Sequence, residues 1–543
     1  MTVAERIVDR LAADVGTVFG IPGKQTLPLN AALADRGVDF VVARHETAVS
    51  HAAWGYAETS GRMAATVVVP GPGDTNAMNG LKNAYNDCTP LLHLAVETDP
   101  EIRGGDGIHE TPPDTYDNVV KENVTVETPQ GAVAAVDGAI RTARTDPKGP
   151  VRVGVPKNFL GTDVPQAAVA ERAPPDPPAP DLDALAAAGD CLADADRPVV
   201  VAGGGVRAAD ATDDLRAVAE RLAAPVVATY KGKGVFPEDH PLSAGVLCGG
   251  SSPELAALLA HADAALAVGT DLDAVATGRW RFDLPEALVH VTLDPGDVGR
   301  GYDPSVALVA DAGATLAALT DGLPARDGGI DRAAAVREAD AERIDAVGDG
   351  DPPLTSPEAL AAVRAGCRRD TVVSADAGGF RIWTLVSYPA AGPRRYVNPG
   401  SWATMGTGLP AAIGAASADP DRDVLALTGD GGLLMCLHEL HTLAAEELDV
   451  TVVVFTNHDY AIISEEAVRS HGLEGYGWGD APIDFVAVAE GFGLRAVRAE
   501  TVAEITEAVE AARAGDGPGL VEVPTDPAEP QASEWMADPV EEP

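Results

Sequence analysis

Residues 424–457 read VLALTGDGGLLMCLHELHTLAAEELDVTVVVFTN, and this stretch decides the fold of the region around it. The apolar run 424–428 predicts a buried strand, the glycines at 429–432 a tight turn, residues 433–447 a helix, and 450–456 a second strand. Such a βαβ unit brings both strand ends to one edge of a parallel sheet. Asp430 and Asn457 are therefore expected to lie side by side.

The edge where these strands end carries the groups that a magnesium diphosphate requires. Asp430 offers a carboxylate and Asn457 an amide oxygen. A helix that begins directly after the glycine turn also points free backbone N–H groups at this edge, where an anion binds. Mg²⁺ prefers a few such oxygens together with phosphate and water. The pattern predicts a metal–diphosphate site, and an ordinary glycine turn in an α/β core is the alternative.

Glycine-punctuated motifs also lie near the other end of the chain. They read GIPG at 20–23, RHETAVSHAAWGYA at 44–57 and GPGDTNAMNGLKNAYNDCTP at 71–90. With the 429–457 unit, they make the chain resemble the thiamine diphosphate (ThDP) enzymes, most closely the acetolactate (acetohydroxyacid) synthase branch. The resemblance extends from about residue 3 to residue 525. It implies an α/β fold with three doubly wound parallel-sheet domains.

Two polar, breaker-rich stretches divide the chain. Residues 163–182 are too rich in proline for a helix or a central strand and are predicted to form a linker, and residues 348–357 mark a second boundary. The expected domains are 1–162, 183–325 and 350–525, followed by an acidic tail at 526–543. By resemblance, the first domain would bind the ThDP pyrimidine, the second would form a central Rossmann-like layer, and the third would bind the diphosphate with Mg²⁺.

The resemblance also implies roles for single residues. Glu46 matches the catalytic glutamate that activates the cofactor's aminopyrimidine ring, and Met405 the bulky residue that holds the cofactor bent. Mg²⁺ would be held by the side chains of Asp430 and Asn457 and by the backbone carbonyl of Asp459. The expected cofactor-binding residues are Pro22, Gly23, Glu46, Asn76, Gly378, Gly379, Met405, Gly429, Asp430, Gly431, Gly432 and Asn457.

Other positions depart from the synthase pattern. Gly379 and Phe380 stand where a Gln-His pair commonly contacts the diphosphate, so backbone N–H groups are expected to take over that contact. His109 replaces a glutamine near the expected substrate, which makes it a second candidate catalytic residue. Its imidazole could relay protons or bind a carboxylate there. A solvent-exposed loop histidine is an equal alternative.

By resemblance, the chain is expected to use ThDP and Mg²⁺ to decarboxylate a 2-oxo acid and to pass the resulting enamine to an acceptor. The alternatives are a simple 2-oxo acid decarboxylase of the benzoylformate or pyruvate decarboxylase type, a non-catalytic paralogue, and an adenine-nucleotide module built on the central domain. The synthases bind FAD in the central domain, but the glycine turn at 203–205 supports flavin only weakly, so it is not predicted. Because two subunits form each site in this family, a homodimer or homotetramer is expected.

The composition of the chain limits the partners and the environment that are expected for the protein. The net charge is −44, the pI is about 4.4, and only seven of the 39 basic residues are lysines. Such a surface argues against nucleic acid as a partner and suits a halophilic source, where salt screens self-repulsion. No run of 18 apolar residues and no secretion signal is found, so a cytoplasmic protein without a membrane partner is expected. The five scattered cysteines are best explained as small buried apolar residues.

Overall fold

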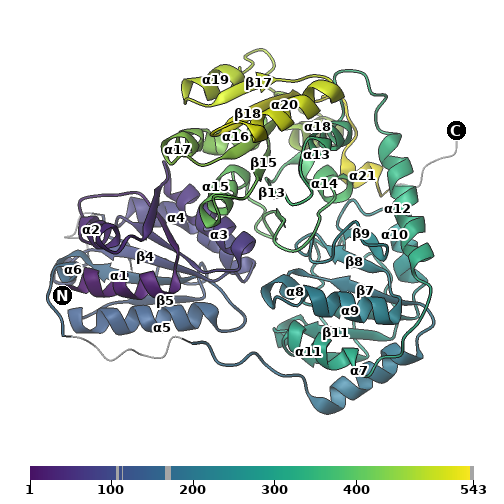
Figure 1. Ribbon diagram of the computed structural model, residues 1–543, viewed down its shortest axis with the longest axis horizontal. Coiled ribbons are helices and arrows are strands. Elements are labelled where there is room, and N and C mark those ends of the chain that lie inside the picture. Colours follow the sequence, from purple (N-terminus) through teal and green to yellow (C-terminus); the bar gives the residue numbers. More distant parts are fainter. Residues whose placement is uncertain (105–108, 113, 166–172, 538–543) are drawn as a thin grey trace.

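Three parallel six-stranded sheets organise the computed structural model, which describes residues 1–104, 109–112, 114–165 and 173–537 (Figure 1). Each sheet is covered by helices on both faces. This architecture confirms the predicted α/β fold with three doubly wound parallel sheets. Among the described residues, no helix is long and apolar enough to cross a membrane.

The first sheet has the strand order β2-β1-β3-β4-β6-β5. Its strands are β1 (Thr17–Gly20), β2 (Asp39–Val42), β3 (Ala64–Val68), β4 (Leu91–Glu97), β5 (Glu122–Thr125) and β6 (Val151–Pro156). Its main helices are α1 (Val3–Asp14), α2 (Leu27–Arg36), α3 (Glu46–Ser60), α4 (Pro72–Asn86), α5 (Ala132–Arg144) and α6 (Lys157–Leu160).

The second sheet has the order β12-β11-β10-β7-β8-β9, so its strand order reverses between β7 and β10. The strands are β7 (Pro198–Ala202), β8 (Val226–Thr229), β9 (Ser243–Leu247), β10 (Ala264–Val268), β11 (Leu288–Thr292) and β12 (Val306–Val309). The helices are α7 (Leu182–Asp194), α8 (Gly204–Ala208), α9 (Thr212–Leu222), α10 (Pro253–Ala260), α11 (Ala312–Thr320) and α12 (Ile330–Asp345).

The third sheet has the order β14-β13-β15-β16-β18-β17. The strands are β13 (Val372–Ala375), β14 (Tyr396–Val397), β15 (Val424–Gly429), β16 (Val450–Thr456), β17 (Arg495–Arg498) and β18 (Gly519–Pro524). The helices are α13 (Ser356–Ala365), α14 (Gly379–Ser387), α15 (Gly408–Ala418), α16 (Asp430–Cys436), α17 (Leu440–Ala445), α18 (Ala461–His471), α19 (Phe485–Gly491), α20 (Val502–Ala514) and α21 (Ala532–Trp535).

The βαβ unit predicted from residues 424–457 is present, with one difference. β15 and β16 are parallel neighbours, and their register pairs Gly429 with Phe455. The helix begins at Asp430, directly after the strand, and a 3-10 turn, η4 (Leu437–Glu439), interrupts it before α17. The helical segment is therefore two short helices joined by a turn. This turn becomes important below.

The first and third domains share one hydrophobic core. α3 packs along α15, and Ala52, Trp54 and Leu409 are fully or almost fully buried within the same cluster. Gly55 and Gly414 lie at this helix contact, where an added Cβ would overlap the backbone of the facing helix. Figure 1 shows these two domains in contact through α3 and α15. The packing holds Glu46, the first residue of α3, in a fixed place relative to the third sheet.

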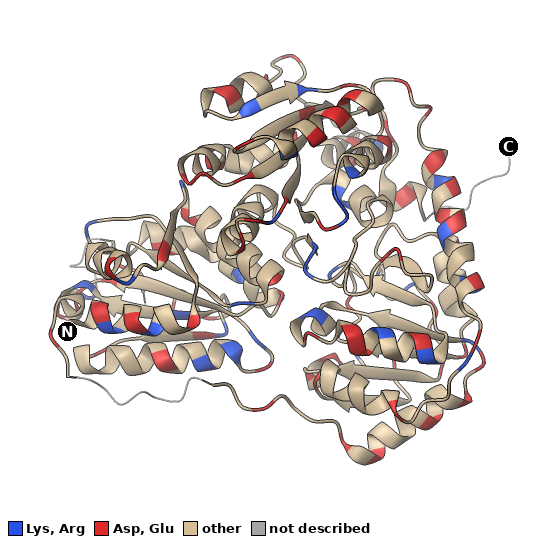
Figure 2. Cartoon of the chain, viewed as in Figure 1, with Lys and Arg blue, Asp and Glu red and all other residues tan. Residues whose placement is uncertain are grey.

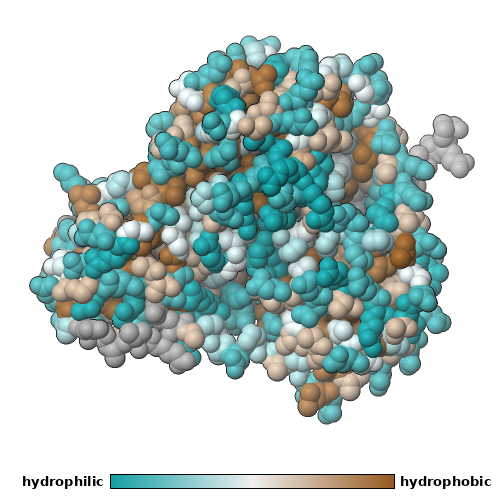
Figure 3. Space-filling view, in the orientation of Figure 1, coloured by the Kyte–Doolittle hydropathy of each residue, from teal (hydrophilic) through white to brown (hydrophobic). Residues whose placement is uncertain are grey.

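Acidic side chains are spread over the outer faces of the helices. Figure 2 shows several on α12 and on α20. The face seen in Figure 3 is largely hydrophilic, with apolar residues in scattered groups. The five cysteines are all free. Cys248 and Cys436 are buried as expected and Cys191 and Cys367 are half-buried, but the prediction is wrong for Cys88, which is exposed and lines a cavity.

Candidate functional site

A cavity of about 280 Å³ opens at the carboxyl edge of the third sheet. Its lining comes from the ends of β13, β15 and β16, the starts of α14 and α16, the turn before α15, and the chain after β18. The expected residues among the lining are Gly378, Gly379, Met405, Gly429, Asp430, Gly431, Gly432, Asn457 and Asp459. The structure thus brings all the sequence-predicted residues of the third domain to one cavity.

Asp430 and Asn457 lie side by side, as predicted. The backbone N–H of Asn457 donates to Asp430 Oδ2 at 3.1 Å, and that of His458 donates to the same oxygen at 2.6 Å. Gly431 donates its backbone N–H to Asp430 Oδ1 at 2.7 Å. Burial raises the pKa of Asp430, and these three N–H groups oppose the rise. The carboxylate is therefore held rigidly at the start of α16.

This oxygen set fits Mg²⁺ better than a softer metal. The Asp430 carboxylate keeps lone pairs beyond those that the N–H groups use, and the Asn457 side chain faces the same cavity. Asn457 Oδ1 accepts the backbone N–H of Asp459 at 3.2 Å, which fixes the turn that carries the third expected ligand. Within the described residues, no group of three or more His, Cys, Asp or Glu could hold a metal. A zinc-type centre is thus not among them.

Asp376 organises the turn that carries Met405, a role that sequence reasoning missed. Its carboxylate is fully buried and accepts the backbone N–H groups of Gly406 at 3.2 Å and Thr407 at 3.0 Å. The Thr428 hydroxyl, at the end of β15, donates to Asp376 Oδ2 at 3.0 Å. Burial raises the pKa of Asp376 to about 6. The sequence signal that could have revealed this role is the position of an acidic residue directly after an apolar strand.

Met405 itself is half-buried beside the glycine turn. A Cβ on Gly431 would lie 3.3 Å from Met405 Cε and 2.7 Å from Tyr460 Cε1. A Cβ on Gly432 would lie 2.7 Å from Asp376 Oδ2. These positions need glycine because the backbone approaches its neighbours closely. The Gly431 N–H donates to Asp430 Oδ1, so an anion could use only the remaining N–H groups in the first turn of α16.

Gly378 and Gly379 form the second glycine turn at this edge. Gly378 has a φ of +139°, a conformation that suits glycine, and Gly379 begins α14. The Phe380 ring stacks on Phe455, with ring centroids 5.4 Å apart, and both residues line the cavity. The start of a nine-residue helix here offers backbone N–H groups to an anion. That backbone donors replace the Gln-His pair stays a prediction.

Glu46 lies in the first domain, at the start of α3, and is half-buried. The Asn76 side-chain amide donates to Glu46 Oε2 at 3.0 Å. A Cβ on Gly73 would lie 3.0 Å from Glu46 Oε1, so glycine keeps the space beside that oxygen open. Glu46 and Asn76 thus meet, but neither lines the cavity of the third domain, whose described lining runs from Ser356 to Gln531. Within one chain, the two halves of the expected site are separate.

The remaining predicted residues of the first domain occupy loops. Pro22 is exposed, and Gly23 begins a turn in which its N–H donates to Thr26 Oγ1 at 3.0 Å. His109 is exposed with a φ of 61°, and its Cα would lie 2.7 Å from a Cβ on Gly71. The residues directly before it, 105–108, lie outside the described part. The roles of Pro22, Gly23 and His109 remain predictions.

A buried polar cluster beneath the 71–76 motif was not expected. Asp74 accepts from Arg152 Nη2 at 2.7 Å, and its Oδ1 lies 3.0 Å from His93 Nε2. Arg152 also donates to Glu97 at 2.9 Å. Burial raises the pKa of Asp74, but hydrogen bonding to His93 and the charge of Arg152 outweigh it and lower the pKa overall. The sequence signal that could have revealed this cluster is the presence of charged residues within the apolar strands β4 and β6.

The chain after β18 closes one side of the cavity. Thr525, Pro527, Glu529 and Gln531 all contribute to the lining. The backbone N–H of Ser356 donates to Glu529 Oε2 at 2.5 Å and its hydroxyl to Oε1 at 2.7 Å. Burial raises the pKa of Glu529 to about 7. The segment predicted as an acidic tail therefore places an ionisable group at the cavity.

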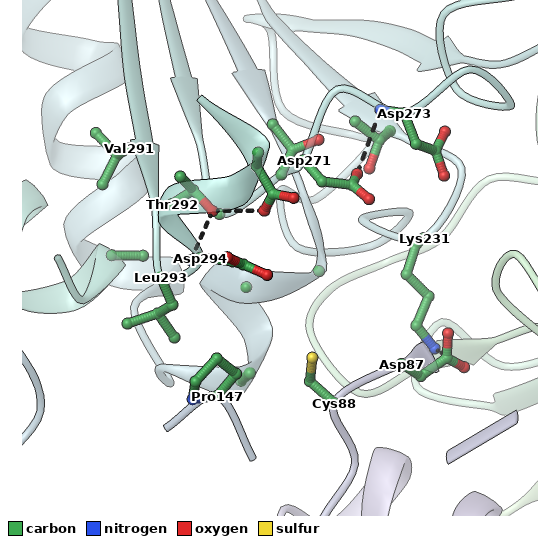
Figure 4. Close-up of a pocket in the computed structure, with 18 of the residues that line it drawn as sticks. Asp87, Cys88, Pro147, Lys231, Asp271, Asp273, Val291, Thr292, Leu293 and Asp294 are labelled. Carbon is green, nitrogen blue, oxygen red and sulfur yellow. Dashed lines mark hydrogen bonds and ion pairs between the residues drawn. The ribbon is translucent and has the colours of Figure 1, made fainter. Parts of the chain in front are cut away.

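A second cavity, of about 320 Å³, lies at the carboxyl edge of the central sheet, where its strand order reverses (Figure 4). Open α/β sheets bind ligands at such a reversal. The glycine turn after β7 contributes, but its N–H groups are partly used: Gly203 donates to Val268 and Gly205 to Gly269. The acidic residues in the lining are Asp87, Asp146, Asp271, Asp273, Asp294 and Asp297.

This lining does not fit the diphosphate of FAD. Lys148 and Lys231 are the cations among the described lining residues, and both are engaged. Lys231 Nζ donates to Asp87 at 2.6 Å, as Figure 4 shows, and Lys148 Nζ donates to the Ala208 carbonyl at 2.7 Å. Burial, followed by Asp273 and Asp297, raises the pKa of Asp271 to about 6. An added anion would meet further repulsion here.

Comparison with known proteins extends these observations. Models described as thiamine pyrophosphate enzyme domains match the chain at three places: the N-terminal TPP binding domain at residues 1–118, the central domain at 185–319 and the C-terminal TPP binding domain at 376–523. An X-ray structure of a candidate thiamin diphosphate-dependent enzyme from Mycobacterium smegmatis is similar with a TM-score of 0.81 and 26% identity, covering 97% of this chain and 99% of that one.

Three curated proteins show how far the similarity in sequence reaches. A probable acetolactate synthase large subunit of Methanocaldococcus jannaschii is 30% identical, covering 97% of this chain and 93% of its own length. The acetolactate synthase isozyme 1 large subunit of Escherichia coli is 31% identical, covering 97% and 94%. A probable 2-ketoarginine decarboxylase of Pseudomonas aeruginosa is 34% identical, covering 96% and 94%.

Proposed function

The chain belongs to the thiamine pyrophosphate enzyme family, and from that premise we propose that it uses ThDP and Mg²⁺ to decarboxylate a 2-oxo acid and join the remaining fragment to an acceptor. The observation that carries the proposal is the edge of the third sheet. There the Asp430 carboxylate, the Asn457 amide and the start of α16 face one cavity.

The residues of the third domain would hold the cofactor. Asp430 and Asn457 would supply side-chain oxygens to Mg²⁺, and Asp459 would add its backbone carbonyl. The starts of α14 and α16 line the cavity, where a diphosphate would accept hydrogen bonds from the backbone N–H groups of these first turns, apart from that of Gly431, which donates to Asp430. When bound, ThDP supplies a carbanion nucleophile and takes up the electron pair that CO₂ leaves behind.

The residues of the first domain would manage the proton that activates the cofactor. Asn76 donates to Glu46 Oε2, which holds the carboxyl group in one orientation and leaves Oε1 toward the open space beside Gly73. Oε1 is thus placed to share a proton with a ring nitrogen.

We also propose that the working unit is at least a homodimer. The described lining of the diphosphate cavity runs from Ser356 to Gln531, so Glu46 and Asn76 of the same chain do not contribute to it. A second copy would bring its own Glu46 to this cavity and complete the site. Sedimentation at varied protein concentration tests this, and an active monomer would contradict it.

A simple decarboxylase is the second candidate. A relative at 34% identity bears the name 2-ketoarginine decarboxylase, and Glu529 places a carboxyl group at the cavity of this chain. Because burial raises the pKa of Glu529 to about 7, a guanidinium group on the substrate would favour its ionised form. A 2-oxo acid with a cationic side chain therefore belongs in any substrate panel.

The test is to incubate the protein with ThDP, Mg²⁺, high salt and a panel of 2-oxo acids that includes pyruvate and 2-ketoarginine. CO₂ and organic products are followed together. One coupled hydroxy-oxo acid per CO₂ supports the carboligase, whereas one aldehyde per CO₂ rejects it in favour of the decarboxylase. A Glu529→Gln variant should then raise KM for 2-ketoarginine alone. If no oxo acid is turned over, the non-catalytic paralogue is the better account.

A further inference from the structure

The turn η4 in the third domain contacts the residues that precede Glu46 in the first domain. Glu439, its last residue, is fully buried. Its Oε1 accepts the backbone N–H of Arg44 at 3.0 Å and that of His45 at 3.0 Å. These residues are nearly 400 positions apart in the chain. The contact therefore exists only because α3 and α15 pack the two domains together.

Neighbouring side chains support the same contact. Arg44 Nε donates to His441 Nδ1 at 2.8 Å, and the rings of His45 and His438 are 5.8 Å apart. The Thr442 hydroxyl donates to Glu439 Oε2 at 2.5 Å, which fixes the carboxylate from its own domain. Side chains of the segment 438–442 thus contact both the backbone and the side chains of residues 44 and 45.

We propose that Glu439 is a positioning residue for Glu46, a role that rests on the proposed function. One oxygen that accepts two successive N–H groups restricts the backbone of Arg44 and His45. His45 is the N-cap of α3, and Glu46 is its first residue. Restricting the cap therefore sets the direction in which the Glu46 side chain leaves the helix. Catalytic groups need such support, because a displacement of about 1 Å costs much of the rate.

The same segment links the two halves of the chemistry. α16 begins at Asp430, the expected metal ligand, and η4 follows it directly with Glu439. A single short stretch of the third domain thus carries Asp430, the expected metal ligand, at one end and Glu439, which contacts His45, at the other. Sequence reasoning did not single out Glu439, because nothing within the 424–457 stretch reveals a partner in the first domain.

The test separates reach from charge with two variants, one that keeps the length of the side chain and one that keeps its charge. Glu439→Gln keeps Oε1 for the two N–H groups and can still bond Thr442, whereas Glu439→Asp keeps the charge but is one methylene shorter. Glu447→Asp is the matched control, since it makes the same one-methylene change at an exposed glutamate that follows α17. Hydrogen–deuterium exchange of the peptide containing residues 44–46 is measured first, without ThDP.

Exchange at Arg44 and His45 should be at least tenfold faster in Glu439→Asp and within twofold of wild type in Glu439→Gln and Glu447→Asp. With ThDP and Mg²⁺ bound, exchange of the cofactor's C2 proton, followed by NMR, should slow at least tenfold in Glu439→Asp alone. ThDP affinity by calorimetry should change less than threefold, because the diphosphate residues are untouched.

The outcomes distinguish the two proposals. Wild-type protein that binds no ThDP, or does not exchange the C2 proton, refutes the proposed function and with it a role for Glu439 in the chemistry. If wild type exchanges the proton and Glu439→Asp does so equally fast, the positioning role is wrong. A loss in Glu439→Gln without one in Glu439→Asp would show that the negative charge matters rather than the reach, and equal losses in both would show that the reach alone does not account for the effect; either result also overturns the proposal.

Discussion

Glu58 of the first domain and Arg207 of the central domain form a buried ion pair, with Arg207 Nη2 2.6 Å from Glu58 Oε2. Their side chains are 8% and 9% exposed. Lys231 Nζ lies 3.4 Å from the same oxygen, and Arg394 of the third domain donates to the Glu58 backbone carbonyl. All three domains therefore meet at this one residue.

Replacing Glu58 with Gln should destabilise the protein by about 3–5 kcal/mol, because it leaves the Arg207 charge buried without its partner. The measurement is the unfolding midpoint in denaturant. The control is Asp210→Asn, which breaks the pair of Arg394 with an aspartate that is 75% exposed and should cost less than about 1 kcal/mol. Equal effects of the two variants would contradict this account.

Acid should weaken the same junction. Burial raises the pKa of Glu58, but the charges of Arg207 and Lys231 outweigh burial and bring it to about 2 from an ordinary value of 4.5. A lowered pKa contributes stability that is present above pH 4.5 and is lost as the pH falls toward 2. Wild-type stability should therefore fall more steeply than that of Glu58→Gln in this window. Parallel curves for the two proteins would show that Glu58 is not the group responsible.

Asp376→Asn should weaken ThDP binding about tenfold, because the amide nitrogen cannot accept the N–H of Gly406 and the turn carrying Met405 loosens. Calorimetry with Mg²⁺ measures the affinity. The control is Ser374→Ala. It removes a buried hydroxyl on β13 that donates to the Gly408 carbonyl, and it should leave the affinity within twofold. Unchanged binding by Asp376→Asn would remove Asp376 from the cofactor site.

The contribution of Asp376 to stability should change with pH in the direction opposite to that of Glu58. Burial raises its pKa to about 6 from 3.8, so it contributes stability below pH 3.8 that is lost as the pH rises through 6. The stability advantage of wild type over Asp376→Asn should shrink between pH 4 and 7. A constant difference across this range would indicate that Asp376 is ionised throughout.

The central cavity should not take up flavin. The purified protein, incubated with excess FAD and dialysed, should show no flavin absorbance, because carboxylates line the cavity and both lysines are engaged. As a counterpart, the double variant Asp271→Asn, Asp294→Asn should bind ADP more tightly than wild type in calorimetry. A yellow wild-type protein, or no gain in the double variant, would show that the carboxylates do not decide what binds.

Salt should stabilise the protein. The net charge of −44 is spread over exposed helices, and KCl shortens the range of their mutual repulsion from about 10 Å at 0.1 M to about 3 Å at 1 M. The thermal midpoint should rise by at least about 5 °C between these concentrations. NaCl at the same ionic strengths is the control, because screening depends on the ionic strength and not on which salt supplies it. A midpoint that does not respond to KCl would argue against the halophilic interpretation.

Local motifs were read well from the sequence because their geometry is set by neighbouring residues. Strand, glycine turn and helix in 424–457 predicted that Asp430 and Asn457 meet, and the structure confirms it. The helix was expected to run unbroken to residue 447, but it is interrupted at Leu437–Glu439. That interruption serves a contact with the first domain, which lies outside the reach of any local pattern.

The sequence by itself determined the βαβ unit at 424–457 and the acidic composition, because periodicity, glycine spacing and charge act over a few residues at a time, and the resemblance to the ThDP enzymes implied the three parallel sheets and the other cavity-lining residues of the third domain. Only the tertiary structure decided which buried charges find partners. Glu439 with His45, Glu58 with Arg207, and Asp74 with Arg152 are far apart in the chain, and packing alone brings them together. Burial costs each of these ions its hydration, so each depends on a partner that the folded chain must supply.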